Sequence, residues 1–249
     1  MATETLLSLK GVVAGYGTMM VLHGASFDVA SRRITTIIGP NGAGKSTLFK
    51  AVFGLLPLAA GDIHFKGRSI VGLKPRALLD LGIAYMPQGR NLFPELSVRH
   101  NLELGGTTVR DRDLLRRRMD EVMDRFPILR ERAGEQASTL SGGEQKMLEV
   151  GRALLLAPEL ILVDEPSMGL APKVTAHLFE TLVELRQAGV TVLMVEQNAR
   201  SALAISDDGI VLEQGRLALA GSADEILSDG RVGALFLGGG LASRKSPPP

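Results

Sequence analysis

The sequence predicts an α/β fold with a mostly parallel core sheet, an antiparallel β edge and an inserted helical subdomain. Short apolar runs rich in β-branched residues, such as 160–163, alternate with longer segments at helical spacing, which is the pattern of buried parallel strands joined by helices. A glycine-rich turn at 39–44 stands between the apolar run 33–38 and a segment that can continue as a helix. The helical subdomain is predicted at about 89–158, where charged residues are dense and helically spaced.

Length and composition fit a globular chain and exclude several kinds of site. The 249 residues are 45% apolar, enough for a substantial core, and 28 basic against 27 acidic residues leave a formal charge of +1. So small a net charge gives no overall field that attracts nucleic acid, and we expect no nucleic-acid partner. Without cysteine there are no disulfides, thiol nucleophiles or cysteine metal sites. No signal-peptide pattern opens the chain and no apolar run approaches the roughly 18 residues that span a bilayer, so the expected location is cytoplasmic.

The stretch from 6 to 28 is predicted to form the antiparallel β edge. Its apolar residues come in short runs broken by glycines, as in small strands joined by turns. Tyr16 lies between two of these glycines, ahead of the glycine-rich turn at 39–44. An aromatic side chain there can stack on a purine base, although a strand-end tyrosine half packed on the core would give the same sequence.

The segment 39–47 carries the whole G-x-x-x-x-G-K-[ST] pattern of a phosphate-binding loop, in the strand-to-helix context that the pattern needs. Glycine backbone offers convergent N–H donors to a polyphosphate because no side chain blocks the approach. The helix N-terminus adds partial positive charge, Lys45 is expected to reach the β- and γ-phosphates, and the Ser46 hydroxyl is expected to ligate Mg²⁺. The residues of this predicted nucleoside triphosphate site are Gly39, Pro40, Asn41, Gly42, Ala43, Gly44, Lys45, Ser46 and Thr47.

A further buried strand is predicted at 83–87, and it ends in Gln88. A neutral amide at a strand end can contact both a magnesium ion and a water molecule beside a γ-phosphate, which makes Gln88 a candidate catalytic sensor and metal ligand. The alternative is a polar residue that merely ends the strand. Before this strand, Pro75 is expected to open a short helix that runs to Leu81.

The helical segment contains a second glycine motif. Acidic and basic residues are mixed along 110–121, which favours a solvated, self-paired helix over a nucleic-acid surface. Beyond it, the hexapeptide from Leu140 to Gln145 precedes apolar residues at helical spacing. Two glycines at a helix start predict a second anion site, made by Ser141, Gly142 and Gly143. Taken alone, the motif would also fit an ordinary N-capped helix.

Two adjacent carboxylates end the apolar run 160–163, at the sheet edge where open α/β folds place their ligands. Neighbouring residues on a strand face opposite ways, so Asp164 and Glu165 cannot share one role. We assign Asp164 to the magnesium shell and Glu165 to the water that attacks the γ-phosphate. The alternative is an acidic pair that faces solvent at a strand end.

The last elements complete the predicted sheet. A helix is expected from Pro172 to Gln187 and a strand at 190–195. A strand at 210–213 is expected to turn back as a hairpin at the Gln-Gly pair that follows it. The four histidines lack metal-ligand spacing and receive no role.

With these motifs together, the chain resembles the ATP-binding subunits of ABC transporters from Leu6 to about Gly238, and the hexapeptide is the most specific match. The resemblance implies a nucleotide-binding domain of the phosphate-loop NTPase fold at 1–238, with ATP and Mg²⁺ as cofactors and ATP hydrolysis as the reaction. It also implies a head-to-tail dimer, in which the 141–143 segment of one domain caps the ATP held by the other. Residues 239–249 have too little apolar surface to offset the entropy of ordering and are expected to be a flexible tail.

Four further stretches resemble one of the two ATPases of branched-chain amino-acid importers: Met86 to Arg90, Gly169 to Pro172, Val195 to Ala199 and the ending Leu235 to Gly239. Urea and amide importers have similar subunits, and the lipopolysaccharide-export ATPase is a more distant relative. The subgroup implies a homologous second ATPase or another copy of this chain as dimer partner, two integral-membrane permease subunits, and an extracytoplasmic solute-binding protein. The subunit would lie on the inner face of the cell membrane, where the Gln88 region moves against cytoplasmic helices of the permeases.

Two positions depart from the general family pattern. Gln197 stands where most members carry a histidine that supports the γ-phosphate, and its amide can form hydrogen bonds without carrying charge. We expect Gln197 to act in catalysis, with capping of the following helix as the alternative. Ala171 stands where an aspartate usually ends the loop after Glu165, which removes that carboxylate from communication across the dimer. Both departures are shared by the branched-chain subgroup.

Two other classes fit the sequence less well. Soluble ABC ATPases that act on ribosomes or DNA usually carry two nucleotide domains or a long coiled coil, whereas this chain has one phosphate loop and no heptad run. A kinase or GTPase switch needs no counterpart of the hexapeptide, and the sequence has no guanine-reading motif. The transported solute is not encoded here, because that specificity lies in partner proteins.

Overall fold

The computed structural model describes residues 4–89 and 91–232, which form two compact units. Unit 1 takes the described residues of Met1–Val52, Leu56–Val71 and Leu193–Pro249, and unit 2 takes Phe53–Leu55 and those of Gly72–Val192. In these described ranges no helix is both long and apolar enough to cross a membrane. The predicted tail at 239–249 lies outside the described residues, and a single domain over 1–238 stays a prediction.

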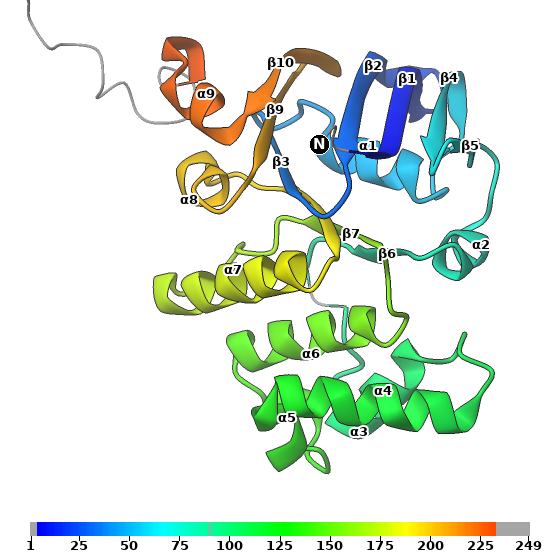
Figure 1. Ribbon diagram of the computed structural model, residues 1–249, viewed down its shortest axis with the longest axis vertical. Helices are drawn as coiled ribbons and strands as arrows, with labels where there is room; N and C mark the ends of the chain where they lie inside the picture. Colours follow the sequence, from blue (N-terminus) through cyan, green and yellow to red (C-terminus); the bar gives the residue numbers. More distant parts are fainter. Residues whose placement is uncertain (1–3, 90, 233–249) are drawn as a thin grey trace, which may run out of the picture. The chain divides into compact units, whose positions relative to one another are not determined.

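Unit 1 contains a four-stranded antiparallel sheet in the order β2-β1-β4-β5 (Figure 1). Its strands are β1 Thr5–Tyr16, β2 Met19–Ala30, β4 Leu58–Phe65 and β5 Arg68–Ser69. The predicted β edge at 6–28 is confirmed as antiparallel, but it consists of two long strands. Gly11 and Gly24, with φ of +60° and +91°, lie at bulges where the pairing register shifts, so the chain passes through them without turning.

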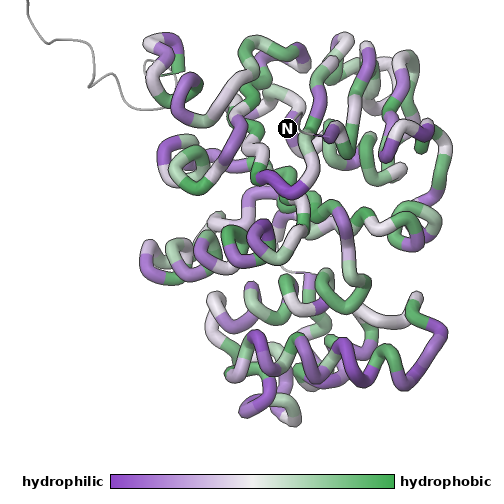
Figure 2. Tube along the Cα trace, in the orientation of Figure 1, coloured by the Kyte–Doolittle hydropathy of each residue, from purple (hydrophilic) through white to green (hydrophobic). Residues whose placement is uncertain are grey.

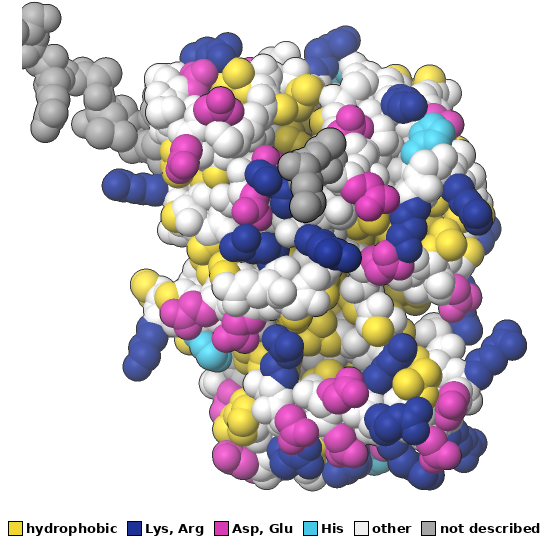
Figure 3. All heavy atoms as spheres, viewed as in Figure 1, with side chains coloured by type: hydrophobic (Ala, Val, Ile, Leu, Met, Phe, Trp, Pro, Cys, Tyr) yellow, Lys and Arg dark blue, Asp and Glu magenta, His cyan; other side chains and the backbone are white. Residues whose placement is uncertain are grey.

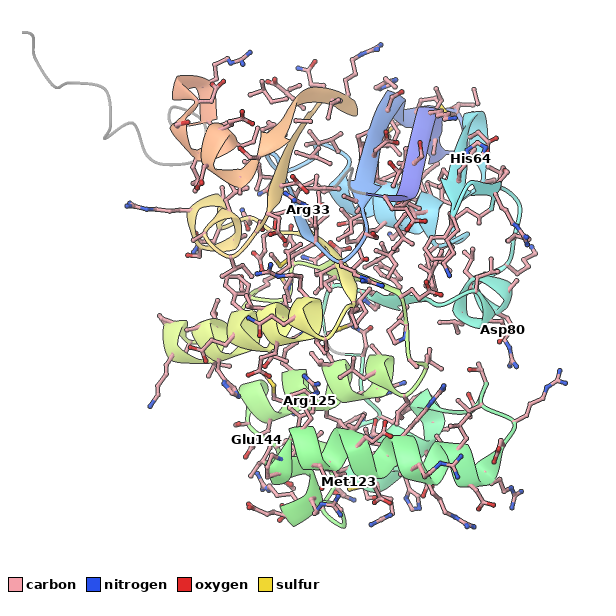
Figure 4. The ribbon with its side chains drawn as sticks, viewed as in Figure 1. Arg33, His64, Asp80, Met123, Arg125 and Glu144 are labelled. Atoms are coloured by element: carbon pink, nitrogen blue, oxygen red, sulfur yellow. The ribbon has the colours of Figure 1, made fainter. Side chains whose placement is uncertain are left out.

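A second group of strands in unit 1 flanks the glycine-rich segment. β3 Ile34–Ile38 pairs in parallel with β9 Asp208–Glu213, and β9 pairs antiparallel with β10 Arg216–Ser222. Arg33, labelled in Figure 4, fixes the first pair with two hydrogen bonds to Asp208, from Nε to Oδ2 at 2.7 Å and from Nη2 to Oδ1 at 2.8 Å. The helices of this unit are α1 Lys45–Val52, α8 Ala199–Leu203 and α9 Ala223–Ser228.

Unit 2 contains a parallel strand pair and a group of helices. β6 Ile83–Met86 and β7 Leu160–Asp164 pair in parallel, and every residue of β7 is buried. β8 Thr191–Val195 begins in this unit and ends in unit 1. The helical elements are α2 Pro75–Asp80, α3 Val98–Gly105, α4 Arg112–Arg125, α5 Pro127–Glu131, the 3-10 helix η1 Ala137–Thr139, α6 Gly142–Leu154 and α7 Pro172–Gln187. The parallel pairs and the separate antiparallel sheet confirm the predicted α/β fold.

In unit 2, α3, α4, α5 and α7 all contact α6 (Figure 1). Gly151 of α6 lets α4 approach closely, since a Cβ at this position would lie 2.8 Å from Cγ1 of Val122. The helices α3 to α6 fall within the segment 89–158, and an inserted subdomain with those limits stays a prediction.

The charged helix predicted from the mixed sequence is α4. It buries Met119, Val122 and Met123, and Figure 2 shows most of its remaining length as hydrophilic. Its charges pair within unit 2: Arg116 Nη1 lies 2.9 Å from Asp113 Oδ1, and Asp124 Oδ1 lies 2.7 Å from Nη2 of an arginine on α5. Figure 3 shows both signs interspersed over these helices, so the self-paired helix is confirmed.

Candidate nucleotide site

The phosphate-binding loop connects β3 to α1 in unit 1, as predicted. Its glycines are required by geometry: a Cβ on Gly39 would lie 2.3 Å from the carbonyl oxygen of Leu212, and Gly44 has φ of +101°. The β9–β10 hairpin supports the loop, because the N–H of Gly215 donates to the carbonyl oxygen of Ala43 at 2.9 Å. α1 begins at the end of this loop, and the partial positive charge of a helix N-terminus favours an anion there.

Lys45 is drawn into the loop that precedes it. Its Nζ donates to the carbonyl oxygens of Gly39 at 2.8 Å and Pro40 at 3.2 Å, and the residue is only 5% exposed. Two backbone carbonyls therefore fix the position of the ammonium group against the loop. The loop thus combines backbone N–H donors with a fixed cation, which is the chemistry that binds a polyphosphate.

Tyr16 ends β1 with its ring partly open to solvent. It is 48% exposed, so the ring is not a packed part of the core. Lys50 of α1 donates from Nζ to the Tyr16 hydroxyl at 3.3 Å, and the same Nζ lies 5.6 Å from the ring centroid. The aromatic face is therefore held beside the helix that follows the phosphate loop.

Gln197 lies beside the phosphate loop within unit 1. Its exposed side-chain amide donates from Nε2 to Oδ1 of Asn41 at 3.3 Å. The cap of α8 is Asn198, whose side chain accepts a hydrogen bond from the N–H of Ser201. The alternative in which Gln197 caps that helix is therefore wrong.

Asp164 and Glu165 lie at the end of β7 in unit 2. Asp164 is the last residue of the strand and is 3% exposed, whereas Glu165 lies beyond it with φ of +46°. The sequence predicts that the two carboxylates face opposite ways because strand residues alternate. Glu165 is not part of the strand, so alternation is not the reason that the two side chains differ in direction. A left-handed turn at Glu165 redirects its side chain, a conformation that costs a non-glycine residue about 1 kcal/mol or more.

Gln88 is held by Glu165. The amide Nε2 of Gln88 donates to Glu165 Oε2 at 2.9 Å and lies 3.2 Å from the sulfur of Met168. The structure thus brings together two of the three predicted catalytic side chains. Met168 was not expected from the sequence, where an exposed methionine after the carboxylates carries no chemical signal.

Tyr85 is a functional candidate that sequence reasoning missed. Its hydroxyl donates to Asp164 Oδ2 at 3.2 Å, and its ring packs on Phe53 with centroids 5.3 Å apart. The signal was available in part, because Tyr85 is one of two tyrosines and lies in β6, which ends two residues before Gln88. What the sequence could not give is the pairing of β6 beside β7.

The hexapeptide motif begins α6 with a capping box. The N–H of Glu144 donates to Ser141 Oγ at 3.4 Å, and the N–H of Ser141 donates to Glu144 Oε2 at 2.7 Å. Within the described residues, the N–H groups of Gly142 and Gly143 donate no hydrogen bond, and Gly142 is exposed. The motif is therefore an N-capped helix that also leaves two donors open.

The predicted site residues divide between the units. The loop residues, Tyr16 and Gln197 belong to unit 1, whereas Gln88, Asp164, Glu165 and the 141–143 segment belong to unit 2. Across the described ranges, no group of three or more His, Asp or Glu side chains could hold a metal ion by itself.

Comparison with known proteins decides the family. Residues 22–168, more than half of the chain, match the family model described as ABC transporter. The chain belongs to the ABC transporter family. As an ATP-binding subunit of this family, it binds ATP and is an ATPase of the kind that powers transport.

Two relatives of this ABC subunit match along almost its whole length. The high-affinity branched-chain amino acid transport ATP-binding protein BraG of Pseudomonas aeruginosa is 43% identical over 234 residues, which is 94% of this chain and 100% of BraG. The probable branched-chain amino acid transport ATP-binding protein LivF of Archaeoglobus fulgidus is 39% identical over 226 residues, covering 90% of this chain and 95% of LivF.

A solved ABC cassette has the same fold. The ADP conformation of MJ1267, an ATP-binding cassette of an ABC transporter, superposes with a TM-score of 0.85 at 29% identity, covering 95% of this chain and 100% of that chain. The ABC-type α/β cassette implied by the sequence resemblance is therefore confirmed.

Proposed function

We propose that this ABC ATPase drives the import of branched-chain amino acids. The observation that carries the proposal is the 43% identity to BraG over 94% of the chain, in a cassette whose phosphate loop and strand-end carboxylates are all present. The proposed domain is 1–238, with a helical subdomain at about 89–158. The subunit works at the cytoplasmic face of the cell membrane.

ATP is held by residues of unit 1 in this proposal. The backbone donors of 39–47 and the Lys45 ammonium bind the β- and γ-phosphates. Tyr16, half exposed at the end of β1, stacks on adenine. The Tyr16 ring is accessible for this contact, and the loop carbonyls hold the Lys45 ammonium group in place.

The residues fit a magnesium ion that arrives with ATP. Ser46, Gln88 and Asp164 offer only oxygen ligands, and Mg²⁺ is usually bound by one or two carboxylates together with substrate phosphates. Bound Mg²⁺ would neutralise phosphate charge. The Tyr85 hydroxyl orients the Asp164 carboxylate.

Hydrolysis requires a water molecule aimed at the γ-phosphate. Glu165 polarises this water as general base, and the Gln88 amide orients the carboxylate that does so. Gln197 donates a neutral hydrogen bond to the γ-phosphate. Its contact with Asn41 of the phosphate loop supports this role.

The proposed active form is a head-to-tail dimer with a homologous ATPase or a second copy of this chain. Ser141, Gly142 and Gly143 of one cassette cap the ATP bound to 39–47 of the other. The open N–H groups at the start of α6 supply the donors, and the partial positive charge of the helix start favours the γ-phosphate.

A cavity of about 270 Å³ in unit 2 suits the membrane partner. It is lined mainly by apolar side chains, with Glu149 and Arg152 as its charged groups, and Pro87 on its wall adjoins Gln88. Half-exposed Phe93 lies 5.6 Å from the Arg152 guanidinium beside it. In the proposed dimer, this surface on each cassette accepts a short amphipathic helix from one of the two permease subunits. The permeases receive solute from an extracytoplasmic binding protein.

Uptake of labelled leucine, isoleucine and valine tests the function. Deleting the gene from its host should abolish high-affinity uptake of all three, and the wild-type chain should restore it while Glu165→Gln should not. Uptake of urea and lysine serves as the control and should be unchanged. Unaltered leucine uptake in the deletion strain, or restoration by Glu165→Gln, would contradict the proposal.

A further inference from the structure

The second anion site carries a negative charge of its own. Glu144, the third residue of α6 and labelled in Figure 4, accepts the N–H of Ser141 at 2.7 Å. Burial by itself would raise the pKa of this carboxyl, but the hydrogen bonds from Ser141 and the charge of Arg132 outweigh burial and lower the pKa. Glu144 is thus anionic at neutral pH, beside donors that the proposed function gives to a phosphate. Like charges so close repel one another.

Arg132 offsets this charge. Its Nη1 donates to Glu144 Oε2 at 2.9 Å, and both side chains are only about a quarter exposed, at 26% and 23%. The same guanidinium donates to Glu135 Oε2, from Nη2 at 2.7 Å and from Nε at 3.0 Å. Among the described residues, Arg132 is the basic side chain that forms an ion pair with Glu144.

The start of α6 is tethered without Arg132 as well. Gln145 donates from Nε2 to the carbonyl oxygens of Ala137 at 3.1 Å and Leu140 at 3.2 Å. The capping box adds two more hydrogen bonds. Loss of the guanidinium therefore leaves the helix start in place and changes mainly the electrostatic environment of the glycine donors.

We infer that Arg132 is a positioning residue of the second anion site: it acts through Glu144, whose charge it offsets, so that Gly142 and Gly143 can receive a phosphate. This inference rests on the proposed function, in which the phosphate is the γ-phosphate of ATP bound to the other cassette. Arg132 itself does not touch the nucleotide. Its effect is confined to ATP held across the dimer.

The test measures ATP-dependent association in the Glu165→Gln background, where the bound ATP is not consumed. The chain is studied alone and with the second cassette subunit of its own transporter. Arg132→Met should weaken association about tenfold, while the affinity of the isolated chain for ATP is unchanged. Arg132→Lys, which keeps the charge, should lose less.

A second substitution separates charge from structure. Glu144→Gln keeps an acceptor for the Ser141 N–H and removes the charge, so the Arg132→Met, Glu144→Gln double variant should regain most of the lost association. The tenfold deficit of Arg132→Met should also shrink at high salt, since screening weakens the repulsion. A purely structural tether predicts neither result.

Each outcome bears on a different claim. Undiminished association of Arg132→Met, or a deficit that Glu144→Gln fails to relieve and salt does not change, would overturn the role of Arg132 alone. If the parent shows no ATP-dependent association either by itself or with the second subunit, the proposed dimer fails, and the inference fails with it.

Discussion

The side-chain amide of Gln88 donates a hydrogen bond to the Glu165 carboxylate over 2.9 Å. Glu165 lies just beyond the last residue of β7, in a left-handed conformation. The amide is therefore a principal restraint on the proposed general base. The sulfur of Met168, 3.2 Å from the same amide nitrogen, is a second and weaker acceptor.

Gln88→Ala should lower kcat for ATP hydrolysis about tenfold, or ~1.4 kcal/mol of transition-state stabilisation, because the carboxylate loses its orienting donor. The residue is exposed, so the melting temperature should hardly change. Met168→Leu is the matched control: it removes the sulfur and leaves the Gln88–Glu165 contact, so kcat should stay near wild type. Equal kcat values for Gln88→Ala and wild type would remove Gln88 from this role.

Tyr85→Phe removes the hydroxyl that donates to Asp164 and keeps the ring contact with Phe53. Mutation of a group that orients a metal ligand typically lowers metal affinity 10–100-fold. The Mg²⁺ concentration for half-maximal turnover should therefore rise about tenfold. ATP binding measured without Mg²⁺ should be unchanged. An unaltered Mg²⁺ dependence would show that the hydroxyl does not orient the carboxylate.

Gln197→Ala and Asn198→Ala form a matched pair of adjacent substitutions. Loss of Gln197 should cut turnover about tenfold, or ~1.4 kcal/mol, with an unchanged melting temperature, because its amide contacts Asn41 of the phosphate loop. Loss of Asn198 removes the α8 cap and should cost about 1 kcal/mol of stability with full specific activity. Gln197→His should be tolerated. A lowered melting temperature with full specific activity for Gln197→Ala, and reduced turnover for Asn198→Ala, would contradict the catalytic role of Gln197.

Gly142→Ala and Gly143→Ala separate packing from anion binding. A Cβ on Gly143 would lie 2.8 Å from Cγ1 of Val174, so alanine there should cost about 1–2 kcal/mol through overpacking. A Cβ on Gly142 meets only Cδ2 of Leu170 at 3.7 Å, an ordinary contact, so the melting temperature should hold. Gly142→Ala should still weaken ATP-dependent association, because the methyl group crowds the open N–H. Normal association would argue against that donor.

Local sequence signals predict much of this fold. The helix expected from Pro172 to Gln187 has those bounds in the structure, and the strand, loop and helix around 39–47 follow as expected. Both segments carry strong signals of their own, from a proline at the first helical position and a glycine pattern between apolar runs. The glycines at 11 and 24 predict turns, but the structure has bulges at both, because glycine is favoured in either.

The sequence does not predict which side chains contact one another. The bond from Tyr85 to Asp164 depends on β6 lying beside β7, and the turn at Glu165 depends on the packing that holds a non-glycine residue at φ of +46°. The capping of α8 by Asn198 instead of Gln197, in contrast, follows residue type, because asparagine is among the preferred N-cap residues and glutamine is not.

Parallel measurement of ATP affinity and steady-state turnover for Glu165→Gln tests the central claim most directly. Glutamine keeps the size of the side chain and the contact with Gln88 while removing the basic carboxylate. The account predicts an ATP dissociation constant close to wild type with turnover reduced at least 100-fold, within the range that general base catalysis contributes. Turnover near the wild-type rate, or a parallel loss of ATP binding, would contradict it.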